Sequence, residues 1–557
     1  MEHIIRAKRF PASMKALVLD GYTDEPACLG VPPYVGPLVR LAYGAMTRAG
    51  AEVSYATVDQ WRAGQADLGM YGLVAVVRNV AVPGKYLRGM PASDRELVAI
   101  ARAVRGRSVA ALGTAVGGRT DGLSCEFDHV AAVDLDATLH DLVKDRVLAD
   151  RSRTMEEWND WLVAGAKLCR EHTDHGGPLI AEVQMYRGCV RYISGGCRFC
   201  VEPLSGDVLY RSPEDIIREA EALAAAGVRN IRLGAQSCVY CYMSKETGSS
   251  ERPTPDPDAV RRVLLGVREA MRPEVFHLDN ANPAVIAAHP DESLEITKTI
   301  AEVCTSGNVL AFGLESADPA VAKANNLNTT AEETVDAIRL VNRVGAARGS
   351  TGLPLVLPGL NFVCGLEGES KETYRLNLEF LRNVLAEGLM LRRINIRQVL
   401  PVRADFPGVA DRRGFEAFKR AVREEIDLPM LDRLLPDRTV MTRVFTELVE
   451  GGKTHGRQVG SYPMLVTLPY KTQVGRWVDV AVTGRGFRSV TGVEHPMDVN
   501  TATLSMLEAV PGIGKRRAMA LVRNRPFEGK EEALRLFDEP VARVSAEFHL
   551  TALRGNK

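Results

Sequence analysis

Three cysteines within twelve residues constrain this chain more than any other feature of its sequence. Cys189, Cys197 and Cys200 lie in the segment 187–200, with two glycines directly before the second cysteine. Thiolates are the ligands that iron–sulfur clusters select, and short spacings allow one loop to wrap a cluster. A structural zinc ion or a fully ligated cluster takes four protein ligands, whereas this loop offers three. The open fourth position favours a cluster that also binds a small molecule over three buried structural thiols.

Length and composition indicate a large globular protein. At 557 residues the chain is too long for one core, and 46% hydrophobic with 25% charged residues is typical of folded domains. The formal net charge is zero, so no overall field attracts nucleic acid or membranes. The sequence has no apolar run of eighteen residues and no secretory signal, and its ten cysteines are partly clustered. We therefore expect intracellular metal or redox chemistry in a reducing cytoplasm.

Strands alternate with helices in the first part of the chain. We expect strands at residues 15–20, 52–56, 73–77 and 109–113, each a short run rich in apolar residues, and a helix over 38–49. This alternation predicts a Rossmann-like, doubly wound α/β domain over residues 1–135, with any ligand at the carboxyl ends of its strands.

The rest of the chain divides by its changing pattern. The predicted units are a helical linker at 136–178, a barrel of strand–helix units at 179–425, a connecting segment with a small antiparallel β unit at 426–497, and a helix-hairpin-helix at 498–557. The barrel strands should contribute their carboxyl ends to the active site.

The cysteine loop resembles that of the radical S-adenosylmethionine (SAM) superfamily. The superfamily usually separates its cysteines by three and then two residues, whereas this chain has seven and then two. The second interval and Phe199, before the last cysteine, keep the pattern. The resemblance implies a [4Fe-4S] cluster on Cys189, Cys197 and Cys200, one iron free to chelate SAM, and Phe199 near the adenine.

Later segments resemble the same superfamily and imply a partial (β/α)6 barrel of the TIM type. Gly234, Ala235 and Gln236 follow a predicted strand where the superfamily contacts the SAM amino group. Glu315 and Ser316 end a further strand, where such a pair approaches the SAM ribose and amino acid. A carboxylate suits ribose hydroxyls because it accepts two hydrogen bonds.

A Rossmann-like domain before a radical SAM loop resembles the cobalamin-binding class of the superfamily. The loop positions that match the class are Pro32, Pro33, Tyr34, Gly117 and Gly118. The sequence lacks an Asp-x-His-x-x-Gly motif, so it offers no histidine as lower axial ligand. Two alternatives remain open for this domain. One is a cofactor-free scaffold. The other is a methylthiotransferase-like domain, which would need three cysteines to hold a second cluster, whereas residues 1–135 offer Cys28 and Cys125.

A second cysteine pair follows the second barrel strand. Cys238 and Cys241 would lie at the mouth of the barrel, where they could bind an auxiliary cluster or zinc. Because two further ligands are not evident, a pair of reduced structural thiols is the simpler interpretation.

The C-terminal segment contains a helix, the turn 511–514 (Pro-Gly-Ile-Gly) and a basic helix. This is the helix-hairpin-helix pattern, whose turn amides can bind a phosphate with help from Lys515, Arg516 and Arg517. The same hairpin can equally be a packing unit or a protein-docking unit. We slightly favour a protein partner, because the rest of the chain shows no basic track.

These features predict a cobalamin-dependent radical SAM methyltransferase acting on an unactivated carbon, with an external electron donor and no membrane association. The order of domains resembles archaeal members of the class, for which the Cα of a glutamine in methyl-coenzyme M reductase is one candidate substrate. The main alternative is a methylthiotransferase-like enzyme that modifies tRNA or another nucleic acid. A binding protein that only kept the fold is disfavoured by the open cluster site.

Overall fold

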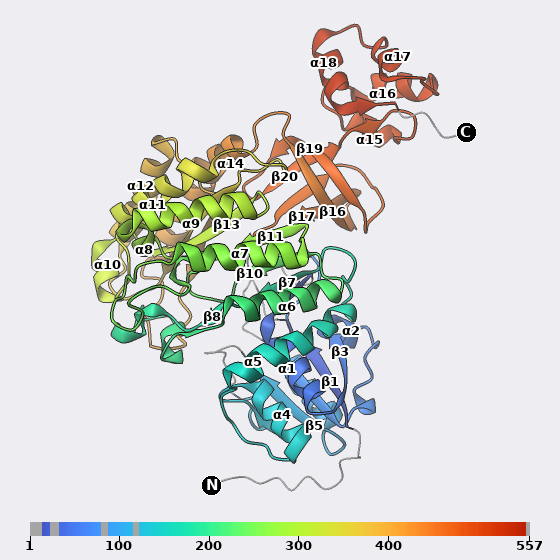
Figure 1. Ribbon diagram of the computed structural model, residues 1–557. Helices are drawn as coiled ribbons and strands as arrows, with labels where there is room; N and C mark the ends of the chain where they lie inside the picture. Colours follow the sequence, from blue (N-terminus) through green and yellow to red (C-terminus); the bar gives the residue numbers. More distant parts are fainter. Residues whose placement is uncertain (1–13, 23–32, 79–86, 115–121, 553–557) are drawn as a thin grey trace.

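The protein is described by a computed structural model in which two parallel sheet systems are joined to two smaller C-terminal units. The described residues are 14–22, 33–78, 87–114 and 122–552. The N-terminal sheet lies at one end of the molecule and the helical C-terminal unit at the other (Figure 1). Pro32, Gly117, Gly118 and Cys28 lie outside the described residues.

The N-terminal sheet has five parallel strands in the order β3-β1-β4-β5-β6. They are β1 (Lys15–Asp20), β3 (Glu52–Thr57), β4 (Leu73–Val77), β5 (Val109–Gly113) and β6 (His129–Val130). Helices α1 (Pro37–Arg48) and α4 (Leu135–Asp145) pack against one hydrophobic face, and α2 (Val58–Arg62) and α3 (Asp94–Val104) against the other. Apolar strands covered on both faces give the doubly wound arrangement that the sequence predicts.

The segment predicted as a helical linker is packed into this domain. Its helix α5 (Met155–Gly165) crosses α1 so closely that a Cβ on Gly44 or Gly165 would overlap the backbone of the other helix. Trp158 and Trp161 of α5 are buried, each with 2% of its surface exposed. Asn159 of α5 also donates to Asp215 of the barrel region at 2.8 Å, so α5 packs on α1 and connects the N-terminal domain to the barrel.

The middle of the chain forms a partial barrel of parallel strands. Its strands are β7 (Ile180–Val183), β10 (Asn230–Leu233), β11 (Val275–Leu278), β12 (Asn280–Ala281), β13 (Asn308–Glu315), β14 (Val356–Cys364) and β15 (Arg393–Gln398). They form two sheets, β11-β10-β7-β2 and β12-β13-β14-β15, which separate at Asp279. The helices that connect successive strands are α6 (Pro213–Ala225), α7 (Pro257–Met271), α8 (Pro283–Ala288), α9 (Pro290–Val303), α10 (Pro319–Ala324), α11 (Ala331–Gly345) and α12 (Lys371–Ala386).

One short strand of the barrel comes from the N-terminal part of the chain. Strand β2 (Tyr34–Val35) pairs in parallel with β7, with Tyr34 opposite Ile180. The sequence predicts this segment as a ligand loop of the Rossmann-like domain. Its buried Tyr-Val pair extends the edge of the barrel sheet and ties the two sheet systems together, and Tyr34 also lines a cavity between them.

A small closed barrel follows the partial barrel, after helices α13 (Arg412–Ala421) and α14 (Leu428–Leu434). Its strands are β16 (Val440–Glu450), β17 (Lys453–Gln458), β18 (Met464–Leu468), β19 (Trp477–Arg485) and β20 (Ser489–Glu494). They close in the order β16-β17-β18-β20-β19, with β18 and β20 parallel. The antiparallel pairing predicted for residues 475–492 is found between β19 and β20, whereas period-two alternation does not reveal that β18 and β20 run parallel.

The last unit is helical. Its helices are α15 (Leu504–Glu508), α16 (Gly514–Arg523), α17 (Lys530–Leu534) and α18 (Pro540–His549). Gly512 and Gly514 have φ of 81° and 57°, which turns the chain sharply between α15 and α16. Among the described helices, none is both long and apolar enough to span a membrane.

Candidate cluster and cofactor site

The three loop cysteines lie together beyond the carboxyl end of β7. All three are half-buried, and they follow the short strand β8 (Tyr186–Arg187). Burial raises the pKa of the Cys200 thiol to about 12, and the charges of Cys197 and Cys189 contribute to this rise. The loop therefore gathers three thiols close enough to interact electrostatically.

This donor set fits a cluster better than a single ion. Among the described residues, no three His, Cys, Asp or Glu side chains converge on a point that could hold one metal ion. In an iron–sulfur cluster each thiolate binds a different iron, so the ligands stand further apart. Burial also raises the pKa of Cys197 to about 11, which favours the neutral thiol. Binding of cationic iron would remove the proton of this thiol.

Arg403, which follows β15 in the chain, is hydrogen-bonded to the backbone of the cysteine loop. Nη1 of Arg403 donates hydrogen bonds to the carbonyl oxygens of Gly195, Cys197 and Cys200 at 2.6, 3.2 and 3.1 Å. Nothing in the sequence around Arg403 links it to a loop 200 residues earlier, so its role could not be predicted from the sequence.

Glu315 ends β13 in a strained conformation. Its φ is 64°, and the pairing of β13 with β14 shifts register between Gly313 and Glu315. Such irregularities aim side chains at functional sites. Burial raises the pKa of Glu315 to about 8, and its charge raises the pKa of Cys197, so the carboxyl lies near the cluster loop. Ser316 is buried, and its hydroxyl accepts a hydrogen bond from the backbone N–H of Asp318 at 3.2 Å.

The predicted Gly-Ala-Gln stretch offers mainly backbone. Ala235 has a φ of 56°, and a Cβ on Gly234 would overlap the Glu182 carboxylate. The amide of Gln236 is bound to backbone, since it accepts from Met185 N–H at 3.3 Å and donates to a carbonyl at 3.1 Å. Phe199 is half-buried within the cysteine loop.

A cavity of about 330 Å³ separates the two sheet systems. Val77 and Gly113 line it from the carboxyl ends of β4 and β5. Glu182, Ala235 and Asp279 line it from the carboxyl side of the barrel strands. The ligand-binding edges of a doubly wound sheet and of a barrel therefore meet at one space.

Paired charges line this cavity. Arg187, two residues before Cys189, donates to Asp134 at 3.0 Å, and Arg153 lies 3.0 Å from the same carboxylate. Across the cavity, Arg232 lies 2.8 Å from both Glu182 and Asp279. The Tyr34 hydroxyl donates to Glu182. These ion pairs could not be predicted from the sequence, because each joins residues that are not neighbours in the chain.

Cys238 and Cys241 are buried beside the cluster loop. A hydrogen bond to Cys238 raises the pKa of the Cys241 thiol, and Cys238 Sγ accepts from Asn282 N–H at 3.2 Å. Charge on Cys238 would also raise the pKa of Cys189, which shows that the pair lies near the first loop cysteine.

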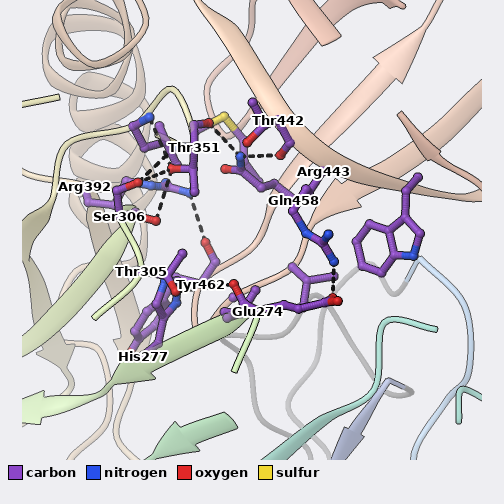
Figure 2. A pocket seen from close by; sticks show the side chains of 17 residues that line it. Glu274, His277, Thr305, Ser306, Thr351, Arg392, Thr442, Arg443, Gln458 and Tyr462 are labelled. Carbon is purple, nitrogen blue, oxygen red and sulfur yellow. Dashed lines mark hydrogen bonds and ion pairs between the residues drawn. The ribbon is translucent and has the colours of Figure 1, made fainter. Parts of the chain in front are cut away.

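A second, smaller cavity lies at the opposite end of the barrel (Figure 2). Its volume is about 30 Å³, and residues of the small closed barrel form one side of it. Its polar groups bind one another: the Gln458 side chain donates to the backbone carbonyls of Thr351 and Thr442, both at 2.8 Å. This cavity is a packed interface far from the cysteine loop in the fold.

One of the basic residues at the predicted phosphate-binding turn is bound by another residue of the C-terminal unit. Lys515 and Arg516 are exposed, whereas Arg517 forms an ion pair with Glu539, just before α18. Gly512 packs near Ala542 of α18.

Comparison with known proteins identifies the central domain. The model of the radical SAM superfamily matches residues 183–364. An uncharacterized protein of Methanocaldococcus jannaschii, MJ0274, is 42% identical over 504 residues, which are 86% of this chain and 93% of that protein. The ribosomal protein uS12 methylthiotransferase RimO of Acidithiobacillus ferrooxidans is 25% identical over 319 residues, 55% of this chain and 66% of RimO. The structure of the radical SAM methyltransferase TsrM from Kitasatospora setae, with cobalamin and a [4Fe-4S] cluster bound, is 14% identical with a TM-score of 0.47, covering 69% of this chain and 72% of TsrM.

Proposed function

Because this chain belongs to the radical SAM superfamily, we propose that it is a cobalamin-dependent methyltransferase that places a methyl group on an unactivated carbon. The cavity between the two sheet systems carries this proposal. A cofactor bound at the edge of the N-terminal sheet would face a substrate held at the mouth of the barrel.

In this proposal the three loop cysteines, Cys189, Cys197 and Cys200, hold a [4Fe-4S] cluster. Such a cluster, with SAM bound, would supply a radical able to abstract hydrogen from the substrate carbon. Arg403 keeps the loop folded around its ligands. Glu315 accepts hydrogen bonds from SAM, and a cation beside it would lower its raised pKa and favour the carboxylate.

Cobalamin would occupy the N-terminal side of the cavity and supply the methyl group. Val77, Gly113 and Leu135 form an apolar wall there, at the carboxyl edge where doubly wound sheets bind ligands. Gln184 and Thr114 also line the cavity and could bind polar groups of a cofactor. No histidine is among the described residues that line it, so the proposal assigns no protein ligand to the cobalt.

The second candidate, a methylthiotransferase, is favoured by the similarity to RimO. It would need a second cluster to provide sulfur. Residues 1–135 contain only Cys28 and Cys125, one fewer than the three thiolates such a cluster needs, and Cys125 is exposed. The cysteine content therefore favours methyl transfer.

We propose that the substrate is a protein. One candidate is methyl-coenzyme M reductase, methylated at the Cα of a glutamine. No single residue of this chain identifies that substrate. The C-terminal unit would dock this partner. The ion pair between Arg517 and Glu539 removes one of three cations from the predicted phosphate site, which favours protein over nucleic acid. Submicromolar, steeply salt-dependent binding of tRNA or duplex DNA to the full chain would contradict this choice.

Anaerobic purification followed by extraction of cofactors tests the proposed function. We expect one cluster and one cobalamin per chain, whereas a second cluster without cobalamin would favour sulfur insertion. Val133 lines the cavity and is 44% exposed, so Val133→Trp should obstruct cobalamin without unfolding the protein. The control is Val147→Trp, which changes a similarly exposed residue (41%) outside the cavity lining and should bind cobalamin normally.

A further inference from the structure

The long first interval of the cysteine loop contains a turn of helix. Helix η4 (Val190–Ser194) begins directly after Cys189, and Gly195 and Gly196 follow it with φ of 79° and 63°. The turn directs the side chain of Arg191 inward, where 4% of its surface is exposed. The residues that lengthen this interval thus bring a cation into the loop.

The Arg191 guanidinium is fixed by four hydrogen bonds. Nη1 donates to Cys197 Sγ at 3.1 Å and to the Asn326 carbonyl oxygen at 2.8 Å. Nη2 donates to Asn326 Oδ1 at 3.1 Å, and Nε donates to Glu251 at 2.9 Å. The Asn326 amide in turn donates to the Gly196 carbonyl at 2.9 Å. The planar fork of arginine therefore has one orientation, with a donor aimed at the sulfur.

We propose that Arg191 is a positioning residue that sets the reduction potential of the cluster through Cys197. When the cluster accepts one electron from a low-potential donor, its negative charge increases and no covalent bond breaks. An N–H group of a cation on a ligating sulfur stabilises the more negative state and raises the potential. This inference rests on the part of the proposed function that assigns the cluster to the three cysteines, and it does not require cobalamin.

Glu251 should act on the reduction potential of the cluster in the direction opposite to Arg191. Its carboxylate accepts from Arg191 Nε, and its side chain is 35% exposed. The negative charge of Glu251 offsets part of the guanidinium charge that acts on Cys197. Glu251→Gln should therefore strengthen the effect of Arg191 on the sulfur, whereas Arg191→Gln should remove it. A merely structural role would not give shifts of opposite sign.

The test is a redox titration of the reconstituted full-length protein, followed by electron paramagnetic resonance of the reduced cluster. In Arg191→Gln, the ratio of reduced to oxidised cluster at a fixed potential should fall about tenfold, a shift of about 59 mV to more negative values for one electron. Arg191→Lys should give a smaller negative shift, and Glu251→Gln a positive shift. Arg198→Gln is the matched control, because Arg198 is 43% exposed in the same loop and lies over the Phe406 ring.

If Arg191→Gln cannot hold a cluster, Glu251→Gln still decides, since it keeps all three thiols and the arginine. A positive shift in Glu251→Gln supports the proposal. A midpoint in Glu251→Gln that is unchanged, or that moves to more negative values, would overturn it. A protein that shows the expected shifts but binds no cobalamin would contradict the methyl-transfer proposal and leave this inference standing.

Discussion

The two ends of the partial barrel differ in the size of the cavity that each holds and in what surrounds it. At the carboxyl end lie the cysteine loop and a cavity of about 330 Å³ lined by ion pairs. Two residues there, Ala235 and Glu315, have left-handed backbone conformations. At the amino end the small closed barrel leaves a cavity of about 30 Å³, which is lined by the ion pair of Glu274 with Arg443, itself at a φ of 56°. In barrels of this kind the carboxyl end carries function and the amino end carries stability.

The amino end is closed by backbone contact. A Cβ on Gly352 would overlap the carbonyl of Val440, and a Cβ on Gly460 would lie 2.7 Å from the His277 ring. Only glycine allows this approach. The small barrel therefore docks at close range on the barrel floor, leaving the opposite mouth free for ligands.

Buried charges extend this docking to the N-terminal domain. Glu447 of the small barrel is buried between Arg457, at 2.5 Å, and Arg88, at 2.6 Å. Arg88 also pairs with Asp174 at 2.5 Å. Removing one member of a buried network leaves a charge without its partner, which is strongly destabilising. The small barrel thus braces both sheet systems from the side away from the cysteine loop.

The largest effect is expected from the cysteine loop itself. Cys197→Ala should abolish the iron–sulfur absorption and SAM cleavage, because it removes one of three protein ligands. Cys304→Ala is the control, since Cys304 is a buried thiol outside the loop. We expect Cys304→Ala to retain iron, measured after anaerobic reconstitution. Full iron content in Cys197→Ala would show that Cys197 is not a cluster ligand.

The amino end should respond to acid. Burial lowers the pKa of His277 to about 4, and Nδ1 of its ring accepts from Ser461 N–H at 3.0 Å. The unfolded chain binds this proton near pH 6.5 and the folded chain only near pH 4, so stability falls as pH decreases through this window. The full effect is about 3 kcal/mol.

His277→Asn should remove this part of the pH dependence, measured by urea unfolding of the apo-protein between pH 7 and pH 4.5. His172 and His549 also have pKa values lowered to about 4 by burial, so the slope should decrease and not vanish. Equal slopes in wild type and variant would mean that the folded protein accommodates a charged His277.

A methyl group at the same interface should cost about 2 kcal/mol of stability, typical of overpacking. Gly460→Ala forces a Cβ against the His277 ring, whereas in Gly484→Ala of the same small barrel the nearest atom would lie 3.6 Å away. Denaturant midpoints should separate the two variants, and both should load the cluster like wild type. Loss of the cluster in Gly460→Ala would show that the two ends are coupled.

Features that depend on local patterns could be predicted from the sequence. Strands β4 and β5 lie at the predicted residues, because continuous apolar runs identify buried parallel strands. The match to the radical SAM model confirms the superfamily that the cysteine loop indicated. Local patterns were sufficient for both.

Features that depend on distant pairing were not accessible in this way. Strand β2 has only two residues, and nothing in Tyr34–Val35 reveals that it pairs with β7. The same holds for Arg403, which acts on carbonyls 200 residues away. Arg191 lies inside the loop, so a charged residue among predicted ligands was a signal that could have been used.

The smallest effect should come from loosening the loop without touching a ligand. Arg403→Gln removes a charged donor that binds three loop carbonyls, and hydrogen bonds to charged groups contribute about 1.5 kcal/mol each at the lower end. If the loss is equivalent to one such bond, a chelator should remove iron about tenfold faster, since 1.4 kcal/mol corresponds to tenfold. Arg198→Gln should lose iron at the wild-type rate, because Arg198 contacts Phe406 and Glu367 through its exposed side chain. Equal rates in both variants would mean that the three cysteine thiolates alone hold the loop in place. The bound cluster, and not the surrounding barrel, would then order the carboxyl end.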